Sequence, residues 1–283
     1  MHTLPFPDRA PVVTAFRVQR DAGAEVRIAP REAPVEAIVR VGNGSGSILG
    51  NDTPIPAGYA SADLVLGRAW SGASASDRGW GLRLGAAGMI ESVRDRNGVA
   101  GTAPLGFVYY RPTIVSGERL VGEAHAITYL DTVRLTFEGA LAQESRSRDD
   151  DGNPSTPRVA LDPIRSSGLT AELAWVALGG ARAPGFAPTL APGSSGAWAG
   201  GALEVAVRFD ALWLGWGAAD VTEGGALAGG ASVRWWPVDF VTVTLAGHVT
   251  RYATPPIETP QEIWSWDALL RLGVFWGLGA VNG

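Results

Sequence analysis

The chain has 283 residues, with 28 acidic and 23 basic residues, and every basic residue is arginine. Its formal net charge of −5 argues against nucleic-acid binding, which requires a basic surface. The absence of cysteine excludes a disulfide framework and a cysteine metal site. No apolar run reaches the roughly 18 residues of a transmembrane helix, and the N-terminal MHTLPFPDRAP lacks the apolar core of a signal peptide. We therefore expect any export signal to lie outside this sequence.

Eleven segments alternate apolar and polar residues with the two-residue period of a β-strand. In chain order they are Ala22–Ala29, Glu36–Asn43, Tyr59–Trp70, Trp80–Arg94, Val121–Leu130, Thr132–Glu144, Leu169–Leu178, Ala202–Leu214, Ala231–Trp236, Val241–Tyr252 and Ile263–Trp276. Many have the length of a membrane-crossing strand, about 9 to 11 residues. A soluble sandwich would bury the apolar side of each strand, whereas a membrane barrel would turn that side to lipid.

The connections between these segments alternate between short and long, which is typical of an up-and-down barrel with tight turns at one end. The connection 179–200 departs from this rule, because it is long and falls on the short-turn side. Most tryptophans lie near strand ends, where aromatic girdles occur in membrane barrels. The last strand has Trp264, Trp266 and Trp276 at its ends and aliphatic residues between them on the same side. This order favours a bilayer over a sandwich core.

The order and spacing of several segments resemble the phosphate-selective porin family, porins O and P, of Gram-negative outer membranes. The matching segments are RDAGAEVRIA at Arg20, VEAIVRVGNGSG at Val35, WGLRLGAAG at Trp80, the LD turn at Leu130 before TVRLTFEGALAQE, IRSSGLTAELAWVALGG at Ile164, GALEVAVRFDALWL at Gly201, GGASVRWWPVDFVTVTLAGHVTRY at Gly229 and WDALLRLGVFW at Trp266. The resemblance covers nearly the whole chain. It implies a barrel of about sixteen strands, a homotrimer in the outer membrane, and anion transport without a cofactor.

Three features depart from that family. The chain begins after the position of the first family strands, it lacks the lysines expected beside arginine in a phosphate-selective lumen, and GLGAVNG follows Trp276 where such proteins usually end on an aromatic residue. We expect an all-β, transmembrane, antiparallel up-and-down β-barrel forming one domain over 1–283, with 11 to 12 strands visible. Within it we expect an N-terminal lead-in at 1–20, a constriction loop at 95–117, an external loop at 145–167 and a tail at 277–283.

An odd count of eleven strands cannot complete an ordinary antiparallel barrel, which has an even number of strands. Either the N-terminal strands are missing from this chain, or a twelfth strand lies at Phe107–Val115 or Pro11–Val18. The segment 95–117 also has a second interpretation. Its apolar-aromatic run Leu105–Tyr110 suits a loop that folds into the channel and carries Arg111 to the constriction.

Alternation places charges of both signs opposite the apolar side. These residues are Arg27, Arg40, Arg83, Arg134, Arg208, Arg234, Arg271, Glu25, Asp63, Glu91, Glu138, Glu172, Glu204, Asp210 and Asp267. Arginine suits anion binding because its planar guanidinium stays charged and forms paired hydrogen bonds with oxyanions. Ion pairing between neighbouring strands explains the same residues equally well. As pore-lining candidates we select Arg27, Arg40, Arg83, Arg111, Arg134, Glu138, Arg208, Arg234, His248, Asp267 and Arg271.

Signals for catalysis or metal binding are weak. His125 and His248 lack the spacing of a metal site or a nucleophile motif. DDDGN at Asp149 departs from a calcium loop, and GNGSGS at Gly42 precedes no helix. We therefore expect neither an enzyme nor a metal or other cofactor. Two functions stay open: a porin for small hydrophilic or anionic solutes in contact with outer-membrane lipid, and a structural barrel subunit that a partner chain completes or plugs. A soluble β-sandwich enzyme is a third, weaker alternative.

Overall fold

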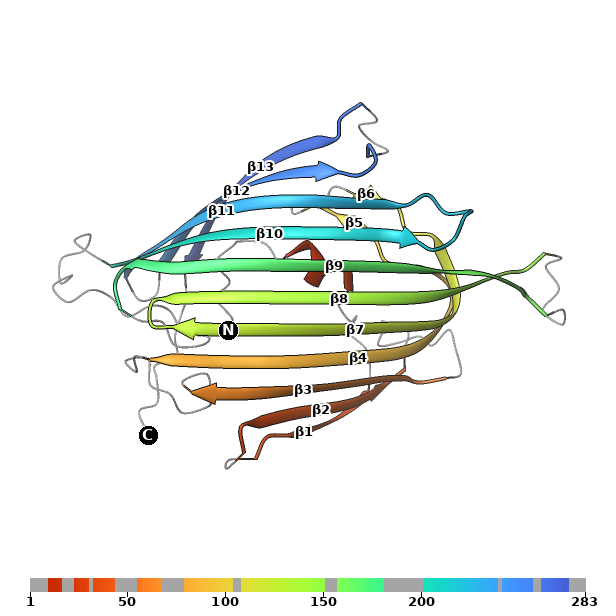
Figure 1. The fold of residues 1–283 in the computed structure, drawn as a ribbon, viewed down its shortest axis with the longest axis horizontal. Coiled ribbons are helices and arrows are strands. Elements are labelled where there is room, and N and C mark those ends of the chain that lie inside the picture. The colour runs from red at the N-terminus through yellow and green to blue at the C-terminus, as the bar shows by residue number, and fades with distance from the viewer. Residues whose placement is uncertain are drawn as a thin grey trace.

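The fold is seen in a computed structural model, which describes residues 10–16, 23–30, 33–43, 55–67, 79–103, 108–150, 157–180, 201–238, 241–256 and 261–274. Eleven strands form one antiparallel sheet (Figure 1): β1 (Gly23–Ile28), β2 (Val35–Gly42), β3 (Ala57–Gly67), β4 (Trp80–Asn97), β7 (Ile114–Leu130), β8 (Val133–Arg148), β9 (Val159–Leu178), β10 (Ala202–Trp216), β11 (Gly224–Val238), β12 (Val241–Tyr252) and β13 (Trp264–Val274). A separate hairpin contains β5 (Gly101–Thr102) and β6 (Val108–Tyr110), and α1 spans Pro11–Phe16.

The strands of the large sheet follow one another in the same order as in the chain, and each pairs with the next. This confirms the predicted all-β, up-and-down antiparallel arrangement, and each of the eleven predicted segments corresponds to one strand. In the described part of the chain, β1 and β13 are the two edges of the sheet. Because the strand direction reverses ten times between them, β1 and β13 run the same way, so direct pairing of these edges would be parallel.

Both candidates for a twelfth wall strand are wrong. Pro11–Phe16 forms α1, in which proline occupies the first helical position, where its missing N–H costs no hydrogen bond. In the other candidate, Val108–Tyr110 form β6 of the small hairpin, and Ile114 already begins β7. The chain between those two strands leaves the hairpin and enters the wall. Neither segment adds a separate strand to the large sheet.

Several strands extend further than their sequence patterns predict. In the predicted external loop 145–167, β8 continues to Arg148 and β9 starts at Val159. The glycine-rich stretch before Ala231 also belongs to a strand, because β11 starts at Gly224. A Cβ at Gly225 would lie 2.4 Å from the backbone oxygen of Leu212, so this close strand approach requires glycine. Glycines that predict a loop here serve strand packing instead.

In a soluble protein the buried face of a sheet is apolar and the exposed face is polar. In this sheet the exposed face is apolar and the buried face is charged. On β10, Arg208 and Asp210 are 5% and 3% exposed, whereas Phe209 between them is 48% exposed. On the edge strand β13, Trp266 and Leu270 are 81% and 75% exposed. The apolar face is therefore the outer one, and the charged face is the inner one. No helix in the described residues is long and apolar enough to span a membrane.

Helix α1 and the β5–β6 hairpin lie on the inner face. Helix α1 contacts β8, β9, β10 and β5, and Figure 1 shows the helix and hairpin within the span of the sheet. Phe16, Tyr109 and Tyr110 form one buried cluster with Leu212 and Leu214 of β10. The inner face is thus covered near β8–β10 by segments from two distant parts of the chain.

Candidate functional site

The inner face carries ten of the eleven predicted pore-lining residues. Strand register places these ten opposite the exposed apolar side chains: Arg27, Arg40, Arg83, Arg134, Glu138, Arg208, Arg234, His248, Asp267 and Arg271. Arg111 differs, because it follows β6 and is exposed. The neighbouring Tyr109 and Tyr110 are buried against the wall instead. In this segment the buried side chains are therefore these tyrosines of the apolar-aromatic run, and the arginine that follows them is exposed.

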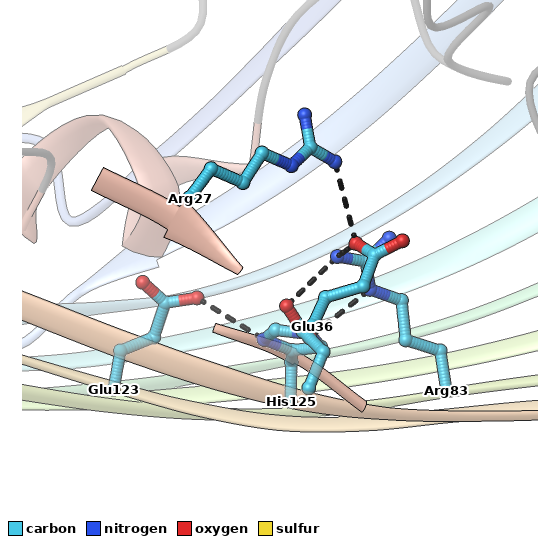
Figure 2. A network of polar contacts seen from close by, with 6 residues as sticks. Arg27, Glu36, Arg83, Glu123 and His125 are labelled. Carbon is cyan, nitrogen blue, oxygen red and sulfur yellow. Dashed lines mark hydrogen bonds and ion pairs between the residues drawn. The ribbon is translucent and has the colours of Figure 1, made fainter. Parts of the chain in front are cut away.

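A chain of polar contacts crosses β1, β2, β3, β4 and β7 (Figure 2). Arg83 forms a bidentate pair with Asp63, with Nε donating to Oδ1 at 3.0 Å and Nη2 donating to Oδ2 at 2.8 Å. Glu36 lies 3.5 Å from Arg83 and 3.4 Å from Arg27. The Glu36 carboxylate therefore links the two guanidinium groups across the strands. Bidentate geometry fixes the orientation of the guanidinium as well as its charge.

His125 continues this network on β7. Its Nε2 lies 2.8 Å from Asp63 Oδ1, and its Nδ1 lies 3.6 Å from Glu123 Oε1. Figure 2 shows the imidazole between the Glu123 carboxylate and the Arg83 side of the network. Gly85 makes room for this ring, because a Cβ there would lie 2.5 Å from His125 Nε2. The histidine bridges carboxylates from two strands.

A second network lies toward the end of the sheet that carries the long connections. Arg119 Nε donates to Glu144 Oε1 at 2.7 Å, and Arg119 Nη1 donates to Glu91 Oε1 at 3.1 Å. Glu144 is almost fully buried and also accepts the Val99 N–H at 3.1 Å. This carboxylate therefore holds the chain that leads into the hairpin against β8. Arg119 and Glu144 were not among the predicted site residues, although the alternation of β7 continues back to Arg119 and could have identified it.

The third network is buried and joins β10, β12 and β13. Arg208 Nε donates to Asp210 Oδ2 at 2.9 Å, Arg208 Nη2 lies 3.3 Å from His248 Nε2, and His248 Nδ1 lies 2.8 Å from Asp267 Oδ1. Arginine only donates hydrogen bonds, so Nε2 of His248 must accept. The Nδ1–H of a neutral imidazole then donates to Asp267. Nearby, Arg134 pairs with Glu172 at 2.5 Å.

Arg234 contacts a hydroxyl group and an aromatic ring. Its Nε donates to Thr244 Oγ1 at 3.0 Å, and its guanidinium lies 5.4 Å from the ring centroid of Trp236. Stacking of this kind suits a guanidinium, which is more weakly hydrated than an ammonium group. Arg271 is opposite Thr244 in the register between β12 and β13.

An open cavity of about 420 Å³ remains on the inner face beside α1. Val13 and Phe16 of α1 form one wall. The sheet supplies the other walls: Glu25, Ile38, Arg40, Tyr59, Ala87, Gly88, Met89, Val121, Glu123, Glu138 and Ala140. The described residues therefore bound the cavity with apolar side chains, acidic side chains and one arginine.

Tyr109 belongs to the covered part of the inner face. Its ring centroid lies 5.0 Å from that of Tyr252 on β12. Burial raises the pKa of the Tyr109 hydroxyl above its ordinary value, so the phenol stays protonated at neutral pH. The hairpin thus presents neutral aromatic groups, not charge, to the polar wall.

The described residues contain no group of three or more histidine, aspartate and glutamate side chains arranged to hold a metal ion. A scan against protein-family models gave no match, and a search of curated proteins gave none either. The geometry of the inner and outer faces is therefore the basis for a functional proposal.

Proposed function

We propose that this chain forms the wall of an outer-membrane β-barrel and lets small hydrophilic solutes diffuse across it. The observation that carries the proposal is the reversed polarity of the sheet. In water, an apolar face of this extent would be left uncovered, since monomeric soluble proteins rarely expose apolar patches larger than a few hundred Å². In a bilayer the same face is solvated by lipid chains, and the charged face lines an aqueous lumen.

The spacing of tryptophans supports a bilayer of ordinary thickness. Trp175 pairs with Val205, eight residues before Trp213 on β10. Through β12, Trp235 on β11 is in register with Leu272 on β13, and Leu272 lies eight residues after Trp264. Eight residues span about 26 Å along a strand, or about 20 Å across the membrane at a tilt of about 40°, close to the roughly 25 Å apolar band of such barrels.

Outward-facing arginines agree with this placement. Arg251 lies 5.9 Å from the ring centroid of Trp264, and Arg165 lies 5.4 Å from that of Trp216. Both pairs lie toward the long-connection end of the sheet. Arginine and tryptophan together are suited to the level of the lipid headgroups, where a side chain meets both water and apolar chains. The resemblance to phosphate-selective porins adds a Gram-negative outer membrane and a homotrimer to this proposal.

Planar-bilayer conductance of the purified, detergent-solubilised protein tests the proposal. We expect stable ohmic steps, and we expect the folded protein to migrate differently in a detergent gel before and after boiling. Proteoliposomes that swell in an uncharged sugar would show the same pathway without an applied voltage. A folded, heat-modifiable protein that neither conducts nor admits sugar would contradict the porin proposal.

The second candidate is a non-conducting barrel subunit that another chain completes or plugs. The observation that favours it is the pair of parallel sheet edges, because an odd number of additional strands is needed to join β1 to β13 in antiparallel pairing. The mass of the detergent-extracted complex, measured by native mass spectrometry, separates the candidates. A mass equal to one chain or a multiple of it would support the porin proposal. A mass that includes a stoichiometric second polypeptide would support the barrel-subunit proposal.

A further inference from the structure

We propose that the cavity beside α1 selects cations over anions, through the carboxylates of Glu25, Glu123 and Glu138. This inference rests on the proposed function and names the charge of the solute. It is the opposite of the anion preference that the arginine content and the family resemblance suggest. The reason is that arginines of the inner face such as Arg83, Arg119 and Arg208 are paired with acids, whereas these carboxylates line the open space.

These arginines attract anionic solutes only weakly, because a carboxylate lies beside each of them. Arg83 pairs with Asp63, Arg119 with Glu91 and Glu144, and Arg208 with Asp210. Arg27 and Arg134 have partners too, in Glu36 and Glu172. An ion pair presents a dipole to a distant solute instead of a full charge, and its field decreases steeply with distance. Formal arginine content therefore overstates the positive potential of this face.

The acids of the cavity have less compensation. Glu25 and Glu138 form no salt bridge with any residue in the described part of the chain. Glu123 lies 3.6 Å from His125, and its side chain is 49% exposed. Among the described residues that line the cavity, Arg40 is the one basic residue, against these three carboxylates. The described lining therefore carries an excess of negative charge.

Strand register brings the three acids to one place. Glu123 pairs with Ala140 across β7 and β8, and His125, two residues further on, pairs with Glu138, so the two carboxylates lie on adjacent strands of the same face. Glu25 reaches the cavity from the far side, on β1. Val13 and Phe16 of α1 close the space from the interior. An excess of charge of one sign between low-dielectric walls focuses its field on the space between them, which raises the local concentration of counter-ions.

The experiment is a reversal-potential measurement in a potassium chloride gradient, on the full chain and on the triple variant Glu25→Gln, Glu123→Gln, Glu138→Gln. The matched control is Glu118→Gln, because Glu118 lies on β7 like Glu123 but on the outer face. We expect the unmodified channel to favour potassium over chloride. Each carboxylate at about 6 Å from the ion path in water raises the local potassium concentration roughly threefold, so the triple variant should lose most of the preference.

Glu118→Gln should leave the potassium preference unchanged, and higher salt should reduce it in the unmodified channel through screening. Open channels that prefer chloride would overturn the inference, and so would a potassium preference that survives in the triple variant. Heat-modifiability of each variant shows whether it is folded, and the single variants Glu123→Gln and Glu138→Gln replace the triple variant if it fails to fold. A folded chain without conductance or sugar uptake would instead refute the proposed function itself, and this inference with it.

Discussion

Arg146 and Asp220 form a bidentate ion pair that ties the end of β8 to the connection between β10 and β11. Arg146 Nη1 donates to Asp220 Oδ1 at 2.8 Å, and Nη2 donates to Oδ2 of the same carboxylate. The Arg146 side chain is buried, while that of Asp220 is exposed. Arg146 also donates to the backbone oxygen of Asp162 on β9. One guanidinium therefore joins three neighbouring parts of the wall.

Acid should weaken this tie at a pH that Asp220 sets. The hydrogen bond from Arg146 holds the pKa of Asp220 below its ordinary value, despite a smaller opposing effect of burial. The stabilisation is then fully present above the unfolded pKa of about 3.9, and it is lost as the pH falls through the lower folded value. Hydrogen exchange of residues 217–223 between pH 5 and pH 2 would measure the loss.

Asp220→Asn should remove this pH dependence and raise the exchange rate already at pH 5. Asp150→Asn is the control, since Asp150 pairs with Arg148 in an ion pair whose two side chains are both largely exposed, and such pairs contribute little. Equal pH profiles for the unmodified chain and Asp220→Asn would contradict the assigned role of the pair.

Phe209→Arg tests whether the apolar face meets lipid. Phe209 lies midway between Trp213 and the level of Trp175, at the centre of the proposed apolar band. Arginine near the middle of a bilayer destabilises a transmembrane barrel by about 2 to 4 kcal/mol. We expect that loss in urea unfolding from liposomes, a smaller loss for Trp213→Arg at the band edge, and little change for Phe209→Leu. Surface substitutions in water usually change stability by about 0.5 kcal/mol or less. A change of that size for Phe209→Arg would therefore indicate that Phe209 faces water.

Phe16→Ala tests the docking of α1 on the inner wall. Phe16 is buried against Leu212, Leu214 and the hairpin tyrosines, and removing a buried phenylalanine side chain costs about 3 to 5 kcal/mol. That cost is borne mainly by the short helix, so we expect α1 to detach and single-channel conductance to rise. Thr14→Ala on the exposed side of the same helix should leave the conductance unchanged. An unaltered conductance in Phe16→Ala, with α1 shown by spin-label distances to be displaced, would mean that α1 does not limit the passage.

His248 should carry its proton on Nδ1. Its Nε2 faces the Arg208 guanidinium, which has no acceptor, while its Nδ1 faces the Asp267 carboxylate. Nitrogen NMR of the folded barrel, with ¹⁵N-labelled histidine, distinguishes the two neutral tautomers from the imidazolium ion. We expect a proton on Nδ1, and Asp267→Leu should destabilise the fold by about 1 to 3 kcal/mol because it removes the Asp267 acceptor of this buried N–H. A charged ring or the other tautomer would show that the Arg208 contact is absent.

The amino-acid pattern was sufficient to predict the strands and the face on which most of their side chains lie. The two-residue period is local, so Arg27 and Arg271, at opposite edges of the sheet, could both be placed on the polar face without knowledge of any neighbour. The alternation of short and long connections likewise predicted the order of the strands. The pattern did not determine strand ends, because Gly224 and Gly225 have the composition of a loop and yet fit a closely packed strand.

Which charges neutralise one another, and which segments occupy the interior, depends on long-range packing. Asp63 meets Arg83 and His125 through the pairing of three strands, and register shifts such as the one between Glu144 and Arg146 change which side chains are adjacent. Pro11–Phe16 forms a helix, although as an apolar segment it could equally have been a strand, and it is its packing against β8–β10 that places it on the inner face. These outcomes depend on contacts between residues far apart in the chain. The local two-residue period of a strand therefore cannot predict them.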